Sequence, residues 1–553
     1  MKRQLFPILA LMLLSWWSWK PLVSRGFFPI HDDTQVARVV EMGRALRSGQ
    51  FPVRWVADLG YGYGYPLYNF YGPLPYYLGG FFYLLGLDPL VSTKLMFGAG
   101  IILAAFSMYF LVAPTAGRLG GIVAALFYLY APYHAVQVYV RGAVGELWGF
   151  GFLPLLLWAL PNAKKPTANR TVLVGLGLAG VILSHTILGF VATTALFLAI
   201  VLARIFPLEK FRLEAVGFAR KTTISLILGL ALSSFFWLPA ITEMPYTSVV
   251  GQIGPTADFR DHFVCLGQLW NSAWGYGGST SGCLDGMSFK LGKLQLVIAG
   301  FSVLFWLIGR KKLSLPKAHF IYGLVISVGS IFLMTPWSQP VWELIPLAGY
   351  IQYPWRFLTF TALGLAVLGG AFMLVLPHKV LRLLVASVLG LGILYYNGKL
   401  FQPQFIYERA TQSWEAPPEL KYRISRISDE YLPSELLRPA SEKEIVTEVT
   451  APISGGSVQL DFDIGWSSKL AVESESTQEI KVLRAYFPGW RYWVNGKEVS
   501  PRVAGGLPYL TVSPGENVVE IQFRNTPVRT IGNLISVLCL IFLGWFYGKK
   551  SLS

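Results

Sequence analysis

Long apolar segments separated by short polar ones occupy most of the chain. A transmembrane helix needs about 20 predominantly apolar residues. Segments near this length recur as far as residue 396, and one more follows close to the C-terminus. The pattern therefore predicts a mainly α-helical polytopic membrane protein with about twelve transmembrane helices. The expected spans are 5–20, 92–112, 119–133, 145–161, 170–184, 188–206, 222–241, 291–309, 318–334, 356–376, 379–396 and 529–547.

The stretch from 397 to 528 follows a different pattern. Its first part, 397–442, is rich in proline and charge and is typical of a linker, whereas short runs of alternating apolar and polar residues begin at Glu444. The pair Asn495-Gly496 between RYWV and KEVS is a strong β-hairpin signal. We expect an extracytoplasmic β-sandwich-like module here. The predicted domains are 1–396 (transmembrane), 397–528 (linker and β-rich module) and 529–553 (final transmembrane helix and cytoplasmic tail).

Composition agrees with a membrane protein, because only 14% of the residues are charged and soluble domains carry about 25%. The net charge of +16 could indicate nucleic-acid binding, but its distribution favours topology instead. If the spans alternate, the basic residues near their ends fall on one side, which the positive-inside rule makes cytoplasmic. We expect a plasma-membrane protein with both termini cytoplasmic, external loops at 24–91, 242–290 and 335–355, and no nucleic-acid partner. The basic residues are Lys2, Arg3, Arg118, Lys164, Lys165, Arg170, Lys210, Arg212, Arg220, Lys221, Arg310, Lys311, Lys312, Lys317, Lys379, Arg382, Lys549 and Lys550.

Two adjacent carboxylates, Asp32 and Asp33, follow His31 at the start of the first external loop. From Thr34 to Leu46 apolar residues recur at helical spacing, which predicts an amphipathic helix suited to a membrane surface. Asp32 followed by Gln35 also fits a capping box, so helix capping is the alternative role for Asp32. The loop continues as GYGYGYPLYNFYGPLPYY, whose aromatic rings could stack on sugars or anchor in lipid headgroups.

Further ionisable candidates lie at the edges of expected spans, where such groups are either anchors or site residues. Arg141 and Glu146 flank a small-residue turn in RGAVGE, and His185 lies at an expected tight turn, where capping or packing is its alternative role. Arg356 in YPWRF could hold a lipid phosphate, since a guanidinium fork suits phosphate oxygens, or it could anchor in headgroups beside Trp355.

Three cysteines add one structural candidate. Cys265 and Cys283 share the second long external loop, where oxidation is permitted, and form a candidate disulfide. Cys539 lies in the last expected span and is interpreted as a packing residue.

Several of these motifs together resemble a known family. The HD pair, RW…DLGYGYGYPLYNFYGPLPYYL, RGAVGE and PWRF resemble a large family of bacterial and archaeal polytopic proteins labelled "6-pyruvoyl-tetrahydropterin synthase-related". The sequence offers neither a soluble pterin-synthase fold nor its zinc-binding histidines, so the label does not indicate pterin chemistry. The wider architecture resembles the C-type (GT-C) membrane glycosyltransferases, in which an acid in the first external loop serves catalysis and the donor is a polyprenyl-phosphate-linked sugar. The resemblance implies a catalytic role for Asp32, with Asp33 as neighbour or substitute and Glu146 as a further candidate.

The leading hypothesis is therefore a GT-C-like glycosyltransferase that moves a sugar from a polyprenyl-phosphate donor to an extracytoplasmic glycan, lipid or protein acceptor. Asp32 would be the general base, Arg141 or Arg356 would hold the leaving phosphate, and His31 and His185 are substrate-binding candidates. Membrane lipids are the other expected partners.

Two alternatives remain, a transporter or flippase for lipids or small molecules and a non-catalytic cell-envelope scaffold. The acids cluster at external span ends rather than near the midplane, which disfavours transport. No cofactor is identified. Asp32, Asp33 and Glu146 could bind a divalent cation, but no ligand spacing identifies such a site.

Overall fold

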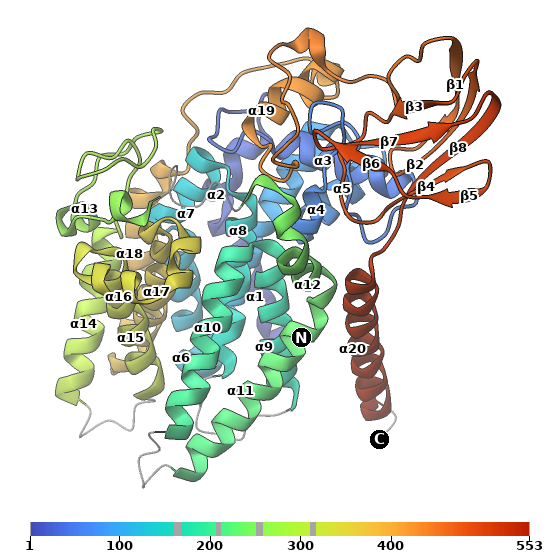
Figure 1. The fold of residues 1–553 in the computed structure, drawn as a ribbon. Coiled ribbons are helices and arrows are strands. Elements are labelled where there is room, and N and C mark those ends of the chain that lie inside the picture. The colour runs from blue at the N-terminus through green and yellow to red at the C-terminus, as the bar shows by residue number, and fades with distance from the viewer. Residues whose placement is uncertain (1, 160–167, 206–211, 250–257, 310–316, 552–553) are drawn as a thin grey trace. The chain divides into compact units, whose positions relative to one another are not determined.

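The computed structural model describes residues 2–159, 168–205, 212–249, 258–309 and 317–551 (Figure 1). Its contacts divide the chain into two compact units. Each unit collects segments that are distant in sequence: the loop expected at 24–91 contributes its first residues, up to Asp32, to unit 1, and the rest belongs to unit 2 with the β-rich module. Unit 1 comprises Met1–Asp32, Lys94–Leu232 and Ile253–Glu408, and unit 2 comprises Asp33–Thr93, Ser233–Gln252 and Arg409–Ser553.

Unit 1 is helical. Its most extensive helix pairs are α15 with α17, α9 with α11 and α8 with α9. Small residues allow the first of these pairs to pack closely: a Cβ atom on Gly364 would lie 2.3 Å from the Ser327 Oγ of the facing helix. The helices are α1 (Lys2–Leu14), α2 (Trp16–Trp19), α6 (Pro89–Leu129, which begins in unit 2), α7 (Pro132–Val136), α8 (Val144–Leu156), α9 (Ala168–Ser184), α10 (Thr186–Ile205), α11 (Arg212–Leu232), α13 (Leu266–Trp270), α14 (Lys293–Gly309), α15 (Lys317–Met334), α16 (Gln339–Leu344), α17 (Leu358–Val375) and α18 (Lys379–Asn397).

The expected number of about twelve spans is not confirmed. Within the described residues, six helices are long and apolar enough to cross a membrane, or up to eight if each of two bent pairs counts as one span. Three expected spans, at 145–161, 170–184 and 291–309, form apolar helices of only 10–17 residues, shorter than the about 20 that a span needs. The expected span 222–241 is also interrupted, because α11 ends at Leu232 and a separate helix begins at Ser234. An apolar run in the sequence does not show where a helix breaks.

Other breaks fall where the sequence predicted them. The 41-residue α6 is interrupted at Gly117 (φ 74°, ψ 174°), between the expected spans 92–112 and 119–133. Helices α9 and α10 meet at His185, in the expected SHTILG turn.

The structure bears on the topology only within unit 1. Figure 1 shows the C-terminal ends of α10 and α14 at the same end of this unit as the N-terminal ends of α11 and α15. This agrees with the alternation used to group the basic residues. Six of those residues, Lys164, Lys165, Lys210, Arg310, Lys311 and Lys312, lie outside the described part of the chain.

Unit 2 contains six helices and two antiparallel sheets. The sheet orders are β1-β2-β8-β4-β5 and β3-β7-β6, so the expected β-rich module is present. Asn495 and Gly496 both have positive φ (51° and 76°) and connect β4 to β5, with Val494 paired to Lys497, as a two-residue type I′ hairpin requires. The helices are α3 (Gln35–Arg47), α4 (Leu67–Phe70), α5 (Leu74–Leu84), α12 (Ser234–Glu243), α19 (Ser425–Ile427) and α20 (Pro527–Ser551). The strands are β1 (Gly456–Asp463), β2 (Ser467–Ser474), β3 (Gln478–Lys481), β4 (Trp490–Val494), β5 (Lys497–Val499), β6 (Arg502–Ala504), β7 (Leu507–Val512) and β8 (Gly515–Phe523).

The predicted amphipathic helix exists as α3, but its interpretation as a surface helix is wrong. Its apolar residues are buried, and so are Arg38 and Glu41 from the polar side, with exposures of 4% and 2%. Helix α3 packs against α5. The charged side chains between its apolar positions therefore belong to the interior of unit 2.

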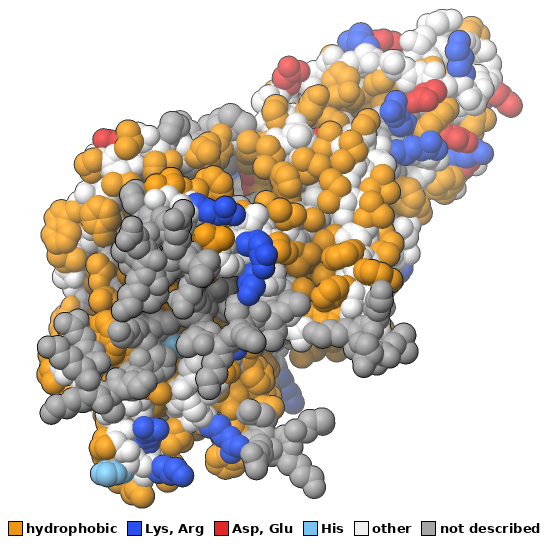
Figure 2. Space-filling model, turned by 90° about the horizontal axis from the view of Figure 1, so that it is seen from below, with side chains coloured by type: hydrophobic (Ala, Val, Ile, Leu, Met, Phe, Trp, Pro, Cys, Tyr) orange, Lys and Arg blue, Asp and Glu red, His pale blue; other side chains and the backbone are white. Residues whose placement is uncertain are grey.

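The last helix, α20, combines a lipid-facing surface with a buried polar end. Leu538 and Phe542 are 63% and 56% exposed, and in Figure 2 hydrophobic side chains cover much of the visible described surface, with few acidic ones. At its first turn, fully buried Arg529 donates to Glu243 Oε2 at 2.9 and 3.0 Å. Glu243 also accepts 2.8 Å from Asn69 Nδ2, so this network joins α20 to α12 and α4.

Candidate functional site

The segment that carries His31 and Asp32 is hydrogen-bonded to the segment that carries Arg141 within unit 1. The backbone N–H groups of His31 and Asp32 donate to the carbonyl oxygens of Val140 (3.0 Å) and Arg141 (2.9 Å). Gly142 permits this approach, because its φ is 64° and a Cβ atom there would lie 2.4 Å from Ile30 Cδ1. The HDD and RGAVGE motifs, more than 100 residues apart, therefore meet.

The Asp32 carboxylate is half-buried and without a partner among the described residues of unit 1. The capping alternative is wrong for this residue, since α3 begins at Gln35, its N-cap is Thr34, and no side chain bonds to the helix start. Asp32 therefore retains lone pairs that can accept a proton or a hydrogen bond.

Glu146 is fully buried and hydrogen-bonded at both oxygens. It forms an ion pair with Arg141 through Oε2, and its Oε1 accepts from Tyr133 Oη (2.7 Å) and Thr359 Oγ1 (3.2 Å). Arg141 Nη1 also donates to Tyr133 Oη at 2.9 Å, and its guanidinium lies 4.6 Å from the centre of the Trp355 ring. These contacts make Glu146 the group that positions Arg141.

The segment 137–141 that carries Arg141 is a short π-helical turn closed by Gly142 in the left-handed conformation, a type of irregularity often found at functional sites. Burial lowers the pKa of Arg141, but Glu146, Tyr133 and Asp32 together outweigh it, so the pKa is raised. Asp32 thus interacts electrostatically with this cation as well as through the backbone.

Arg356 and His185 also belong to unit 1. Arg356 Nη1 donates to Ile351 O (2.5 Å) and Gln352 Oε1 (3.3 Å), and its Nε is buried without a hydrogen-bond partner among the described residues. His185 Nδ1 accepts the backbone N–H of Leu188 at 3.1 Å. His185 therefore caps α10. Capping is the structural role that the sequence analysis gave as the alternative to a site role.

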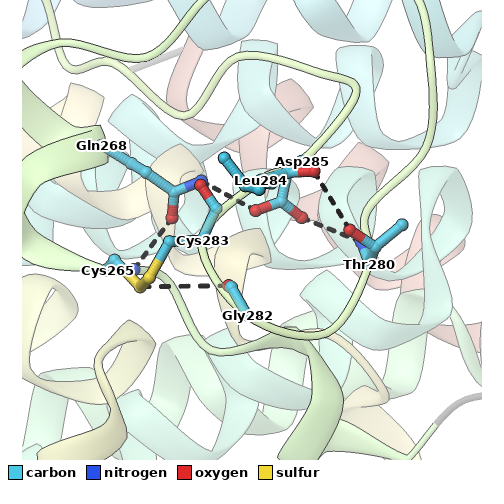
Figure 3. The surroundings of a disulfide bond; sticks show 7 residues. All are labelled: Cys265, Gln268, Thr280, Gly282, Cys283, Leu284 and Asp285. Atoms are coloured by element: carbon cyan, nitrogen blue, oxygen red, sulfur yellow. Dashed lines mark hydrogen bonds between the residues drawn. A yellow bond between two sulfur atoms is a disulfide. The ribbon is translucent and has the colours of Figure 1, made fainter.

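His31 connects the site to the disulfide loop. Its Nε2 lies 2.8 Å from the carbonyl oxygen of Tyr276. In the same loop Cys265 and Cys283 are joined by a disulfide with a Cα–Cα distance of 5.7 Å (Figure 3). The Gln268 side chain accepts from Cys265 N (2.9 Å) and donates to Cys283 O (3.1 Å), so the disulfide and this amide together fix the loop.

Asp33 belongs to unit 2 and has a different environment from Asp32. Its Oδ2 accepts from Arg423 Nη1 at 2.9 Å, and Arg423 Nε donates to Glu419 at 2.7 Å. Burial raises the pKa of Asp33, and Arg423 offsets this only in part. Asp33 is therefore held in an ion-pair network.

Arg423 also lines a cavity of about 600 Å³ in unit 2, together with Arg409, Arg426 and Tyr422. Sequence reasoning missed these residues, because the charge-rich stretch 397–442 was interpreted as a linker or an irregular cap. Its clustered arginines were the available signal. In the described residues, no three His, Cys, Asp or Glu side chains gather as a metal site would require.

The chain belongs to the family described as "6-pyruvoyl-tetrahydropterin synthase related domain; membrane protein", which matches residues 68–402, more than half of its length. The expected family membership is thus confirmed. The matched region contains Arg141, Glu146, His185 and Arg356, whereas Asp32 and Asp33 precede it.

Individual relatives are more distant. An uncharacterized protein of Lactococcus lactis subsp. cremoris (strain MG1363) is 27% identical over 233 residues, which are 40% of this chain and 37% of that protein. Arabinofuranosyltransferase AftD from Mycobacteria aligns with a TM-score of 0.44 and 17% identity over 75% of this chain and 28% of its own. The Archaeoglobus fulgidus oligosaccharyltransferase aligns with a TM-score of 0.42 and 16% identity over 81% of this chain and 59% of its own.

Proposed function

We propose that this protein is a membrane glycosyltransferase that transfers a sugar from a polyprenyl-phosphate-linked donor to an extracytoplasmic acceptor, with Asp32 as general base. One observation carries the proposal. The side chain of the half-buried Asp32 makes no hydrogen bond or ion pair with the described residues of unit 1, and two backbone hydrogen bonds fix its segment beside the buried cation Arg141. A proton acceptor next to a site for a developing phosphate charge is what this reaction needs.

The donors left on the two arginines support a phosphate site. The hydrogen bonds that hold Arg141 and Arg356 all use Nη1. Nη2 of both guanidinium groups and Nε of Arg141 make no hydrogen bond to a described residue, so they are left for phosphate oxygens, which suit guanidinium donors. Glu146 keeps Arg141 oriented, so little side-chain entropy is lost when an anion binds.

The reaction balances with these residues. Asp32 takes the proton of the acceptor hydroxyl as its oxygen attacks the anomeric carbon. The bond from that carbon to the phosphate oxygen breaks, the bonding electrons leave with the polyprenyl phosphate, and Arg141 stabilises the charge. This direct displacement inverts the anomeric centre.

The test is transfer by the full chain in liposomes, with polyprenyl phosphates carrying single labelled sugars and a mixed glycan acceptor. We expect Asp32→Asn to lower the rate about 10²–10⁴-fold, with unchanged thermal stability. Asp461→Asn is the matched control, because Asp461 is an exposed acid on β1. Transfer at the normal rate by Asp32→Asn would refute the base assignment, and the absence of transfer with every donor would refute the activity.

We further propose the plasma membrane as location, with cytoplasmic termini. The one-sided distribution of Lys and Arg supports this. In a Cys539→Ala background, cysteines introduced by Ser441→Cys and Ser551→Cys should differ, and an impermeant thiol reagent should label only the former in intact cells. Labelling of the second site would reverse the orientation.

A further inference from the structure

A second, smaller cavity of about 270 Å³ lies in unit 2, where the turn between β1 and β2 meets the end of α3. Its lining includes Glu41, Arg44, Asp58, Asp463 and Trp466. The turn approaches closely because Gly465 has φ 84°, and a Cβ atom there would lie 2.7 Å from the Ala57 Cβ. None of these residues was selected by the sequence reasoning.

Glu41 lies at the buried end of this cavity and positions Arg44. The Glu41 side chain is 2% exposed, and its Oε2 accepts the backbone N–H of Asp58 at 3.1 Å. Its Oε1 accepts no hydrogen bond from the described residues but forms an ion pair with Arg44 Nη1 at 3.5 Å. The partly exposed side chains of Arg44, Asp58 and Asp463 are therefore the charged groups that a ligand in the cavity can reach.

Trp466 forms a fixed aromatic wall. Its Nε1 donates to Ser48 Oγ (3.0 Å) and Ser48 O (3.2 Å), which sets the orientation of the ring, and the side chain is only half-buried. Two other lining residues are paired with each other, because Arg44 Nη1 donates to Asp58 Oδ2 at 2.6 Å. The cavity therefore combines one aromatic face with planar polar groups held in place.

We propose that this cavity binds one ring of an uncharged sugar. A sugar offers hydroxyl groups that donate to carboxyl oxygens and accept from guanidinium, and its C–H face packs on an aromatic ring. An anion is disfavoured, because the cations beside the lining carboxyl groups are already paired, Arg44 with Asp58 and Arg484 with Asp463. The volume lies below the about 300–1,000 Å³ of typical ligand pockets, which suits a single ring.

The environment of Glu41 supports this choice. Burial and the Asp58 carboxylate raise the pKa of Glu41 to about 8, although Arg44 acts in the opposite direction. Near neutral pH Glu41 is then largely protonated and adds no charge, which agrees with an uncharged ligand. The lining residues all belong to unit 2 and do not include Asp32, so binding of a sugar here does not depend on the proposed activity.

The experiment is equilibrium binding to the full chain in detergent, measured by ligand-observed NMR with a panel of methyl glycosides. The panel contains neutral hexosides, a pentoside, an N-acetylhexosaminide and a uronide. We expect at least one neutral glycoside to bind and the uronide to bind more weakly than its neutral counterpart. Trp466→Ala should weaken binding several-fold to about tenfold, the usual range for one lost stacking contact.

Two variants separate binding from folding. Trp466→Phe keeps a ring but loses the bond to Ser48, so it should retain more affinity than Trp466→Ala. Trp493→Ala removes another half-buried tryptophan in the same sheet, outside the described lining, and should leave affinity unchanged. The proposal fails if no neutral glycoside binds up to its solubility limit, if the uronide binds best, or if Trp466→Ala and Trp493→Ala have the same effect.

Discussion

Glu146 in unit 1 and Glu41 in unit 2 are both buried glutamates, but they have different hydrogen-bonding states. Glu146 is hydrogen-bonded through both carboxyl oxygens, to Arg141, Tyr133 and Thr359. Glu41 lines a cavity, and one of its oxygens forms an ion pair with Arg44 but no hydrogen bond. Hydrogen bonds to both oxygens stabilise a buried carboxylate as the anion, whereas burial without them favours the protonated form. Burial alone therefore does not identify a site.

The adjacent residues Asp32 and Asp33 show the same contrast. Asp33 is paired to Arg423 within unit 2, whereas no described residue of unit 1 bonds to the side chain of Asp32. The neighbour with free lone pairs is the better proton acceptor, although both are carboxylates at the same point of the sequence.

The largest expected effect compares these two aspartates. We expect Asp33→Asn to lower the transfer rate less than the about 10²–10⁴-fold predicted for Asp32→Asn, because Asn can still accept from Arg423. Rates per folded protein and thermal unfolding are measured for both variants. A larger loss of rate for Asp33→Asn, at equal stability, would exchange the two roles.

The second prediction compares two buried ion pairs, Arg141–Glu146 in unit 1 and Arg529–Glu243 in unit 2. Glu146→Gln and Glu243→Gln each leave a buried guanidinium without its counter-charge, so each should destabilise the protein by up to about 3–5 kcal/mol. Only Glu146→Gln should also raise the KM for the lipid-linked donor, since it alone releases Arg141. Thermal unfolding and donor titrations separate the two effects. An unchanged donor KM in Glu146→Gln would remove its positioning role.

The sequence allowed the class and the hairpin at Asn495-Gly496 to be predicted, because hydrophobic periodicity and short motifs encode them. The structure brings the selected residues Asp32, Arg141 and Glu146 of unit 1 together, and their roles stay predictions. It did not show that α3 would be buried on both sides, since a helical pattern does not reveal what covers its polar face. Arg423 and the cavity lined by Trp466 depend on contacts between residues hundreds of positions apart. Such contacts leave no local signal, and the interruption of the expected span 222–241 between Leu232 and Ser234 left none either.

The third prediction concerns the disulfide of unit 1. Among the described residues, unit 2 has no disulfide with which to compare it. Cys265 and Cys283 should be found as one linked peptide by mass spectrometry without reduction. Cys265→Ser with Cys283→Ser should lower stability by about 2–4 kcal/mol and weaken the fixed position of Tyr276 against His31. Free thiols at both positions in protein from intact cells would contradict this. Cys539→Ser is the matched control, because Cys539 is a free cysteine.

The last prediction uses pH to sharpen the comparison between the two glutamates. Glu41 has a pKa of about 8 in the folded protein against an ordinary value of 4.5, because of burial and Asp58. The folded state therefore holds more protons than the unfolded state between these values. The stability that protonated Glu41 contributes is fully present below pH 4.5 and is lost as the pH rises through about 8, by at most about 1.4 kcal/mol per pH unit.

Glu41→Gln cannot titrate, so unfolding between pH 5 and 8, measured by thermal denaturation, should depend less on pH in this variant than in the wild type. Glu415→Gln is the control, because Glu415 is a half-exposed acid that also pairs with Arg44. Parallel pH profiles for the wild type and Glu41→Gln would show that Glu41 is ionised in the folded protein, and the difference in protonation between the two glutamates would be refuted.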